Sequence, residues 1–397
     1  MTRRALRDHL AGAVLGLAVL PFSLLVGRGD DYSIGRLATA RAAAATSAAV
    51  VPPSGITSSP VPADSGEQAL ARPRLGAAVQ WNLQQVHGPE AWSFGTGSAD
   101  VLVAIVDSGV DGAHPDLVGE LVPGRNLRDG STSVQDDVGH GTEVAGIIAA
   151  LGNNDVGVAG LARGVRLMPL KITSPNGSAS SAAAADAIRW AAEHGARVVN
   201  LSFGTLRDVP ALRSAVQEAS SQGVLLVAAA GNCGDAATYR IEGCSQQNQA
   251  HYPAALPEVV AVGALDAASA LAPYSNTGPY VRLTAPGGAG GGARAAPNWV
   301  LSTTPTRQAV SSGRPGYDYE FGTSIAAPHV TAAAALVWSI NPTLSRDQVA
   351  QILFDTADDL GPPGRDDQYG YGRVNAARAA QRAAELPGAV QRPAPGA

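Results

Sequence analysis

Cysteine and lysine are almost absent from this sequence. Among its 397 residues there are two cysteines, Cys233 and Cys244, and a single lysine, Lys171. Because the two cysteines show no C-x-x-C spacing and have no histidine partners at zinc-ligand spacing, a structural zinc site is excluded. In an oxidising compartment such a pair usually closes a disulfide, and the alternative is two free thiols.

The sequence also lacks any stripe of basic residues. Its 28 Lys and Arg residues are offset by 33 Asp and Glu residues, and the net charge of −5 is spread along the chain. Proteins that neutralise nucleic-acid phosphates or an anionic bilayer need clustered positive charge, so we expect no nucleic-acid partner. No segment repeats with a period of about 20 to 50 residues, which excludes a solenoid.

The N-terminus combines positive charge with an apolar stretch. Arg3, Arg4 and Arg7 precede an apolar run over residues 10–26, an arrangement typical of a signal peptide. No small-x-small cleavage site follows at once, so a membrane anchor that tethers the protein is the alternative. The pair Arg3-Arg4 leaves a twin-arginine export route open. In either case we expect a secreted protein or one held in the cell envelope outside the cytoplasm.

Composition divides the chain into four segments. Residues 1–26 form the signal peptide or anchor, and residues 27–74, rich in Ala and then in Pro, Ser and Gly, predict a largely disordered pro-region or linker. Residues 386–397 contain several prolines and predict a disordered tail. Residues 75–385 are left for one folded domain, and an apolar content of 45% is enough for a sizeable core.

Within that domain, short β-branched runs alternate with longer Ala-rich helical patterns. This alternation predicts an α/β fold with a doubly wound, mostly parallel sheet and helices on both faces. The predicted strands are 101–106, 165–172, 197–201, 224–229 and 259–262. The predicted helices are 140–151, 179–193, 211–222, 324–340 and 346–356. The apolar run 332–340 is too short to cross a bilayer, so we expect a buried helix there.

Asp107 and His140 are the first two candidates for catalysis. Asp107 directly follows an apolar strand, at the end where doubly wound sheets place catalytic groups, although an Asx-turn is the alternative. His140 lies between two glycines at the start of a helix, where the helix dipole favours the neutral ring that a general base requires. It would otherwise be an ordinary surface or core histidine. A metal pair with Glu143 lacks a third ligand at the required spacing.

Ser324 and Asn232 complete the set. Ser324 lies in a turn of small residues that leads into an apolar helix, and Pro328 predicts that the helix begins close to Ser324, since proline is tolerated in a first turn. Backbone N–H groups there can hold an oxyanion, whereas the alternative is a helix-capping serine. Asn232 follows the apolar strand 224–229 and offers an amide donor, or it serves only as a turn residue.

Together these four segments resemble the subtilisin-like serine proteases, whose catalytic residues follow the order Asp, His, Ser. The resemblance spans about residues 80 to 380 and includes the stretches 111–117, 200–204, 252–254 and 370–376. It implies a serine endopeptidase that acts on proteins or peptides as a monomer and needs no cofactor for catalysis. Asp107 would orient His140, His140 would activate Ser324, and Asn232 would support the oxyanion.

The resemblance also implies where substrate and calcium would bind. The substrate backbone would lie against Ser202, Phe203 and Gly204, and the primary specificity pocket would lie between these and Ala229, Ala230 and Gly231. No acidic residue occurs in these walls, so we expect an apolar or unspecific preference. Many relatives bind calcium, and the matching residues here are Asp116, Asn154, Val156 and Val158, with an ordinary turn as the alternative.

Some positions depart from the family pattern. Glu143 stands where a second histidine is usual and is expected to tune His140, Ile325 replaces a methionine, and Phe203 replaces a leucine and is expected to narrow a subsite. The pro-region is shorter than the compact inhibitory prodomain that is common in the family. Two further hypotheses remain: a membrane-tethered processing protease of the mycosin type, which would carry a carboxy-terminal membrane helix, and a non-catalytic binding protein that keeps the fold.

Overall fold

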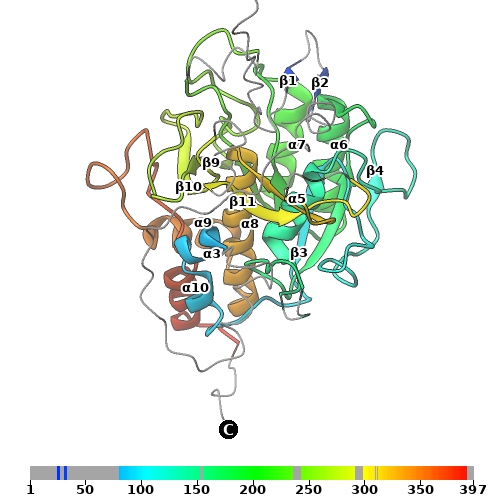
Figure 1. Ribbon diagram of the computed structural model, residues 1–397. Coiled ribbons are helices and arrows are strands. Elements are labelled where there is room, and N and C mark those ends of the chain that lie inside the picture. The colour runs from blue at the N-terminus through cyan, green and yellow to red at the C-terminus, as the bar shows by residue number, and fades with distance from the viewer. Residues whose placement is uncertain are drawn as a thin grey trace, which may run out of the picture.

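A computed structural model of the chain describes residues 25–26, 31–33, 80–152, 154, 156–235, 243–290, 298–308, 310 and 312–390. Figure 1 shows one central sheet with helices packed against it. Apart from the few residues near its end, the predicted signal peptide or anchor lies outside the described residues, and so does most of the predicted linker.

The central sheet has seven strands in the order β10-β9-β8-β7-β3-β5-β4, and every neighbouring pair is parallel. The strands are β3 (Leu102–Asp107), β4 (Arg125–Asn126), β5 (Arg166–Lys171), β7 (Val198–Leu201), β8 (Leu225–Ala229), β9 (Val259–Leu265) and β10 (Val281–Pro286). The five predicted strands are confirmed as β3, β5, β7, β8 and β9. The prediction missed β4 and β10, which lie at the two edges.

Helices cover both faces of this sheet, as predicted. α5 (His140–Ala149) and α8 (Thr323–Ile340) pack on one face, where Val103 and Ile105 of β3 point. α6 (Ser181–Glu193) and α7 (Pro210–Ser221) pack on the other, against Ala104 and Val106. Because both faces of β3 are buried, its sequence is a continuous apolar run rather than an alternating one.

α8 runs through the hydrophobic core on the face of the sheet that it shares with α5 (Figure 1). It is the one helix in the described part of the chain that is long and apolar enough to cross a membrane, but all of it is buried, so it is the predicted core helix. The helices α3 (Trp81–Gln85), α4 (Gly88–Ala91), α9 (Arg346–Asp355) and α10 (Ala376–Glu385) complete this side of the molecule. The start of α9 carries the capping box that Ser345 and Gln348 predict.

Two smaller sheets were not predicted. β11 (Val300–Thr303) and β12 (Tyr317–Glu320) form an antiparallel pair on α5, fixed by a hydrogen bond from Ser302 Oγ to the carbonyl of Glu143. β1 (Leu25–Val26) and β2 (Asp31–Ser33) form an antiparallel sheet with β6 (Ser178–Ser180). β2 falls inside the segment predicted to be largely disordered, so these residues are an exception to that prediction.

The first part of the predicted tail is also ordered. Asn341, at the end of α8, donates from its side chain to the carbonyls of Leu386 and Pro387, and the N–H of Val390 donates to Ile340. These bonds hold residues 386–390 against the core, so the tail cannot begin at residue 386. The remainder, 391–397, lies outside the described residues.

Candidate active site

Asp107 and His140 are brought into direct contact by the approach of α5 to the end of β3. Nδ1 of His140 lies 2.8 Å from Oδ1 and 2.9 Å from Oδ2 of Asp107, and both side chains are buried. A glycine at position 141 is required for this approach, because a Cβ there would lie 2.1 Å from the carbonyl oxygen of Gly109. The glycine beside His140 therefore has a structural reason.

The pKa of the His140 ring reflects two opposing effects. Burial disfavours the charged ring and lowers the pKa, but the negative charge of Asp107 and its hydrogen bond to the ring raise it. The charges of Glu320 and Asp136 act in the same direction, and the pKa is raised above the ordinary histidine value of 6.5. The side chain of Asp107 thus stabilises the protonated ring that a general base becomes after it takes a proton.

Asp136 is a site residue that the sequence analysis missed. This fully buried carboxylate accepts hydrogen bonds from the N–H groups of Val138, Gly139 and Thr142 and from the hydroxyl of Thr142. It also accepts, at 2.8 Å, from the hydroxyl of Ser108, the residue next to Asp107. The bonds join the end of β3 to the start of α5, so Asp136 holds together the two segments that carry Asp107 and His140.

Ser202 and Pro328 explain how Ser324 is held. α8 begins at Thr323, so the predicted helix start close to Ser324 is confirmed, but Pro328 lies in the second turn and not in the first. In a regular helix the N–H of residue 328 would donate to the carbonyl of Ser324, but proline has no N–H. The hydroxyl of Ser202 donates to this carbonyl instead, at 2.6 Å. The start of α8 is thereby bound to the end of β7.

Asn232 has its side-chain amide oriented by Thr323. Its Oδ1 accepts from the N–H of Thr323 at 3.0 Å and from the Thr323 hydroxyl at 2.8 Å. Two donors on Oδ1 fix which end of the amide is the oxygen, so Nδ2, the donor end, lies on the other side. Asn232 therefore contacts Thr323, the residue just before Ser324. The side chains of Asn232 and Ser324 are both almost fully buried.

All four candidate catalytic residues lie at the carboxyl ends of the sheet's strands. Asp107 ends β3 and Asn232 follows β8, and these strands run parallel with β7 between them. Ser324 lies in the first turn of α8, and Glu320 just before it is near enough to His140 to raise the pKa of the ring. This is the carboxyl edge of the sheet, where α/β folds place their ligands.

The two segments predicted to bind the substrate follow neighbouring strands of the sheet. Ser202 to Gly204 follow β7 and Ala230 to Gly231 follow β8, whose ends pair at Leu201 and Ala228. Phe203 is buried in the part of the core that α6 and α7 cover, and its effect on a subsite stays a prediction. Glu143 is fully buried in the first turn of α5.

The chain is similar to known proteins over most of its length. The sequence profile of the subtilase family matches residues 98–372. The chain belongs to this family. Subtilisin DY of Bacillus licheniformis is 36% identical over 303 residues, which cover 76% of this chain and 99% of that protein. Thermitase of Thermoactinomyces vulgaris is 34% identical over 302 residues, with 76% and 96% covered.

Solved structures give the same result for this subtilase. A protease from Pseudoalteromonas arctica has a TM-score of 0.66 and 30% identity and covers 77% of this chain and 97% of its own. A lanthipeptide protease has a TM-score of 0.66 and 31% identity, with 80% and 97% covered. The protein is thus a serine-type endopeptidase that acts on protein substrates, and subtilisins need no cofactor for catalysis.

The residues predicted to bind calcium lie together, but they do not form a cation site. Oδ1 of the buried Asp116 accepts from Asn154 Nδ2 at 2.7 Å, and Oδ2 accepts from the N–H of Val158 at 2.9 Å. The N–H of Val156 donates to Asn154 Oδ1 at 3.4 Å. Calcium needs oxygen ligands, whereas N–H donors face this carboxylate. As they lie, these residues do not fit the ion, and Asp116 binds the loop directly.

Within the described ranges, one group of residues has ligand atoms close enough to hold a metal. It consists of Cys233, Cys244 and His251, whose ligand atoms all lie within 4.8 Å of one another. The structure contains the predicted disulfide between Cys233 and Cys244, so neither sulfur is a thiolate. Metals bind the thiolate, so a single imidazole is left, which is not a metal site.

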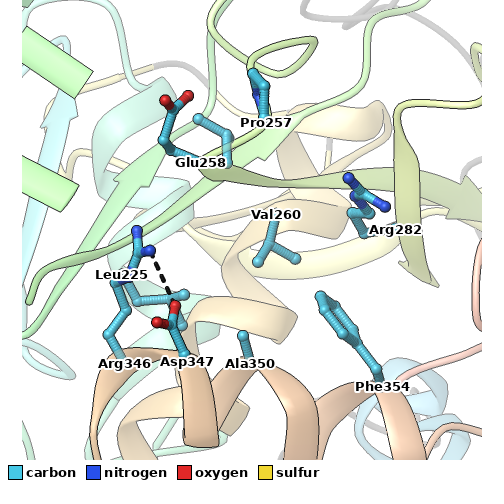
Figure 2. Close-up of a pocket in the computed structure, with 10 residues that line it drawn as sticks. Leu225, Pro257, Glu258, Val260, Arg282, Arg346, Asp347, Ala350 and Phe354 are labelled. Atoms are coloured by element: carbon cyan, nitrogen blue, oxygen red, sulfur yellow. Dashed lines mark ion pairs between the residues drawn. The ribbon is translucent and has the colours of Figure 1, made fainter. Parts of the chain in front are cut away.

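A surface pocket lies at the amino ends of strands in the sheet, away from the candidate catalytic residues (Figure 2). Its lining includes Leu225 of β8, Val260 of β9 and Arg282 of β10, together with Ala350 and Phe354 of α9. Leu225, Val260 and Arg282 lie in the amino-terminal parts of their strands, whereas Asp107 and Asn232 lie beyond carboxyl ends. This pocket is therefore no part of the candidate active site.

Proposed function

We propose that this subtilase is an exported endopeptidase that cleaves peptide bonds with Ser324, His140 and Asp107 and forms an acyl-enzyme on Ser324. The observation that carries the proposal is the contact of both Asp107 oxygens with His140 Nδ1, 2.8 and 2.9 Å, inside a buried site. This contact fixes the proton on Nδ1 and leaves Nε2 to act as the base.

The chemistry proceeds in two halves. Ser324 Oγ attacks the scissile carbonyl while its proton passes to His140 Nε2, and the carbonyl oxygen becomes an oxyanion. The C–N bond then breaks, and the leaving amine takes the proton from His140. Water, deprotonated by His140, attacks the ester on Ser324, and the proton returns to Ser324 as the acid product leaves.

Asn232 is the proposed side-chain donor to the oxyanion. Because Thr323 fixes the amide oxygen, the donor end is set before substrate arrives and needs no reorganisation during the reaction. A single donor of this kind contributes about 3 kcal/mol to transition-state stabilisation.

We also propose where the protein acts and in which oligomeric state. The apolar segment that follows Arg3, Arg4 and Arg7 supports export, with a tether at the membrane as the alternative. The disulfide between Cys233 and Cys244 agrees with an oxidising compartment. We propose that the mature protein acts as a monomer.

A fluorophosphonate probe tests the function. The purified exported protein is treated with the probe, and the labelled peptide is identified by mass spectrometry, with Ser324→Ala as the control. Labelling of Ser324 that disappears in the variant is the expected result. If the folded protein is not labelled, the proposal is wrong and a non-catalytic binding protein becomes the better description.

A further inference from the structure

His251 lies in the gap between the two segments predicted to form the primary specificity pocket. A Cβ built on Gly204 would come within 3.0 Å of His251 Cδ2, and one built on Gly231 within 2.3 Å of His251 Nδ1. The imidazole therefore packs against a glycine of each wall. His251 is only 1% exposed, so the ring occupies this gap and does not project from it.

The backbone of His251 is fixed beside the first wall. Thr205 and Tyr252 exchange two backbone hydrogen bonds of 2.8 Å in an antiparallel bridge, which sets His251 next to Gly204. The carbonyl of His251 also accepts from the N–H of Ala255 at 2.8 Å. Neither contact depends on the imidazole, so a smaller side chain at position 251 leaves the backbone in place.

The ring itself is held from several directions. Nδ1 lies 3.0 Å from the carbonyl oxygen of Gln249 and 3.2 Å from Asn276 Nδ2, and Nε2 lies 3.9 Å from Cys233 Sγ. Withdrawal of the ring would break these contacts and leave the partly buried carbonyl of Gln249 with one donor fewer. The imidazole is thus a fixed part of the pocket and not a movable cover.

The second wall cannot easily move away from the ring. The carbonyl of Ala230 accepts from Asn276 Nδ2 at 3.0 Å and from the hydroxyl of Tyr280 at 2.8 Å, and the carbonyl of Gly231 accepts from the N–H of Asn276. The N–H of Cys233 donates to Asn276 Oδ1 at 2.7 Å. A substrate side chain between the walls therefore meets a filled space with fixed sides.

The ring is also uncharged at neutral pH, because burial lowers the pKa of His251 to about 4. It thus offers no positive charge to an acidic substrate residue.

We propose that His251 fills the primary specificity pocket and determines specificity, so that the enzyme cleaves after glycine, alanine or serine and rejects large aliphatic, aromatic and charged residues. This inference rests on the proposed function, since it names the substrate class of that same site. One methylene too many in a closed apolar pocket already costs roughly 10- to 200-fold in kcat/KM.

Peptide anilides that differ only in the residue before the scissile bond test the inference. The kcat/KM values for alanine and phenylalanine substrates are measured for the wild type, His251→Ala and His251→Asn, with rates divided by the concentration of sites that a fluorophosphonate titrates. The control is His194→Ala, which removes an exposed histidine that stacks on Trp190 at the end of α6. His251→Asn serves if the alanine variant does not accumulate.

We expect the wild type to prefer alanine over phenylalanine by at least about tenfold, and the His251 variants to reduce this preference by a similar factor, while His194→Ala keeps it. A wild type that cleaves after phenylalanine as fast as after alanine would overturn the inference. So would titratable His251 variants with an unchanged preference. Folded wild-type protein that cannot be titrated at all would instead overturn the proposed function, and the inference with it.

Discussion

Ser202 donates its hydroxyl hydrogen to the backbone carbonyl of Ser324, and the two oxygens lie 2.6 Å apart. Pro328 has no N–H to donate to this carbonyl, as residue 328 of a regular helix would. The side chain of Asn200 donates in turn to Ser202, and the hydroxyl of Thr331 donates to Asn200, each at 2.8 Å. A chain of hydrogen bonds therefore fixes the start of α8, and with it Ser324, to the end of β7.

Ser202→Ala should weaken this connection. The variant removes one donor from a buried carbonyl, so we expect the free energy of unfolding to fall by about 1–3 kcal/mol. We also expect slower labelling of Ser324 by the fluorophosphonate, because the nucleophile is held less firmly. Urea denaturation and labelling rates measure the two effects. Ser221→Ala, an exposed serine on α7, is the control and should change neither. An unchanged labelling rate in Ser202→Ala would show that the bond does not position Ser324.

Asp136→Asn should affect catalysis through His140, although Asp136 touches no substrate in the proposed mechanism. An amide cannot accept all the hydrogen bonds that converge on this buried carboxylate from Ser108, Thr142 and the backbone. We expect a loss of about 3 kcal/mol in the free energy of unfolding and a lower kcat with little change in KM.

The control for that variant is Asp129→Asn, an exposed acid in the same loop. A positioning role for Asp136 also predicts that the pH dependence of kcat/KM shifts in Asp136→Asn, since its charge helps to raise the pKa of His140. A variant that is merely less stable, with the kcat and pH profile of the wild type, would contradict the positioning role.

The pH dependence of catalysis should show the raised pKa of His140. The base must be neutral, so kcat/KM should fall as the pH drops through this pKa, and the midpoint should lie above the ordinary value of 6.5. Stability changes with pH in the opposite direction to activity. Because the pKa of His140 is raised in the folded protein, the group stabilises the fold fully below the pKa it has in the unfolded chain. This contribution is lost as the pH rises through the pKa of the folded protein. Rates of a neutral peptide anilide between about pH 5 and 9 locate the midpoint. A midpoint below 6.5 would show that burial outweighs the charge of Asp107.

The sequence predicts most of the sheet because both faces of its central strands are buried. β3 up to Asp107 and β8 are continuous apolar runs, and β7 is apolar except for Asn200. Each of the three ends at a turn that places a candidate residue at the carboxyl ends of the strands. β11 and β12 were missed because polar residues such as Ser302, Asp318 and Glu320 interrupt their apolar pattern. Those polar residues are buried by contacts with distant segments, which periodicity does not reveal.

The candidate catalytic residues were predictable because each lies in its own local motif. Asp136, His251 and the donor role of Ser202 were not, since each depends on contacts between segments far apart in sequence. His251 faces Gly204 only because Thr205 pairs with Tyr252, and Ser202 reaches Ser324 only because α8 crosses the end of β7. An isolated histidine beside Tyr252 carries no pattern that distinguishes it from a core histidine.

Asp116 gives a test of the calcium prediction. Its two oxygens accept hydrogen bonds from Asn154 and Val158, so Asp116→Ala should destabilise the protein whether or not calcium is present, by about 2–3 kcal/mol for the loss of bonds to a buried charged group.

The decisive comparison is the difference in melting temperature between calcium and a chelator, measured for the wild type and for Asp116→Ala. Because N–H donors lie where a cation would need oxygens, we expect this difference to be the same in both proteins. Any stabilisation by calcium would then arise elsewhere in the chain. If the wild type is stabilised by calcium and the variant is not, the loop must rearrange to turn oxygens toward the ion, and Asp116 is a ligand after all.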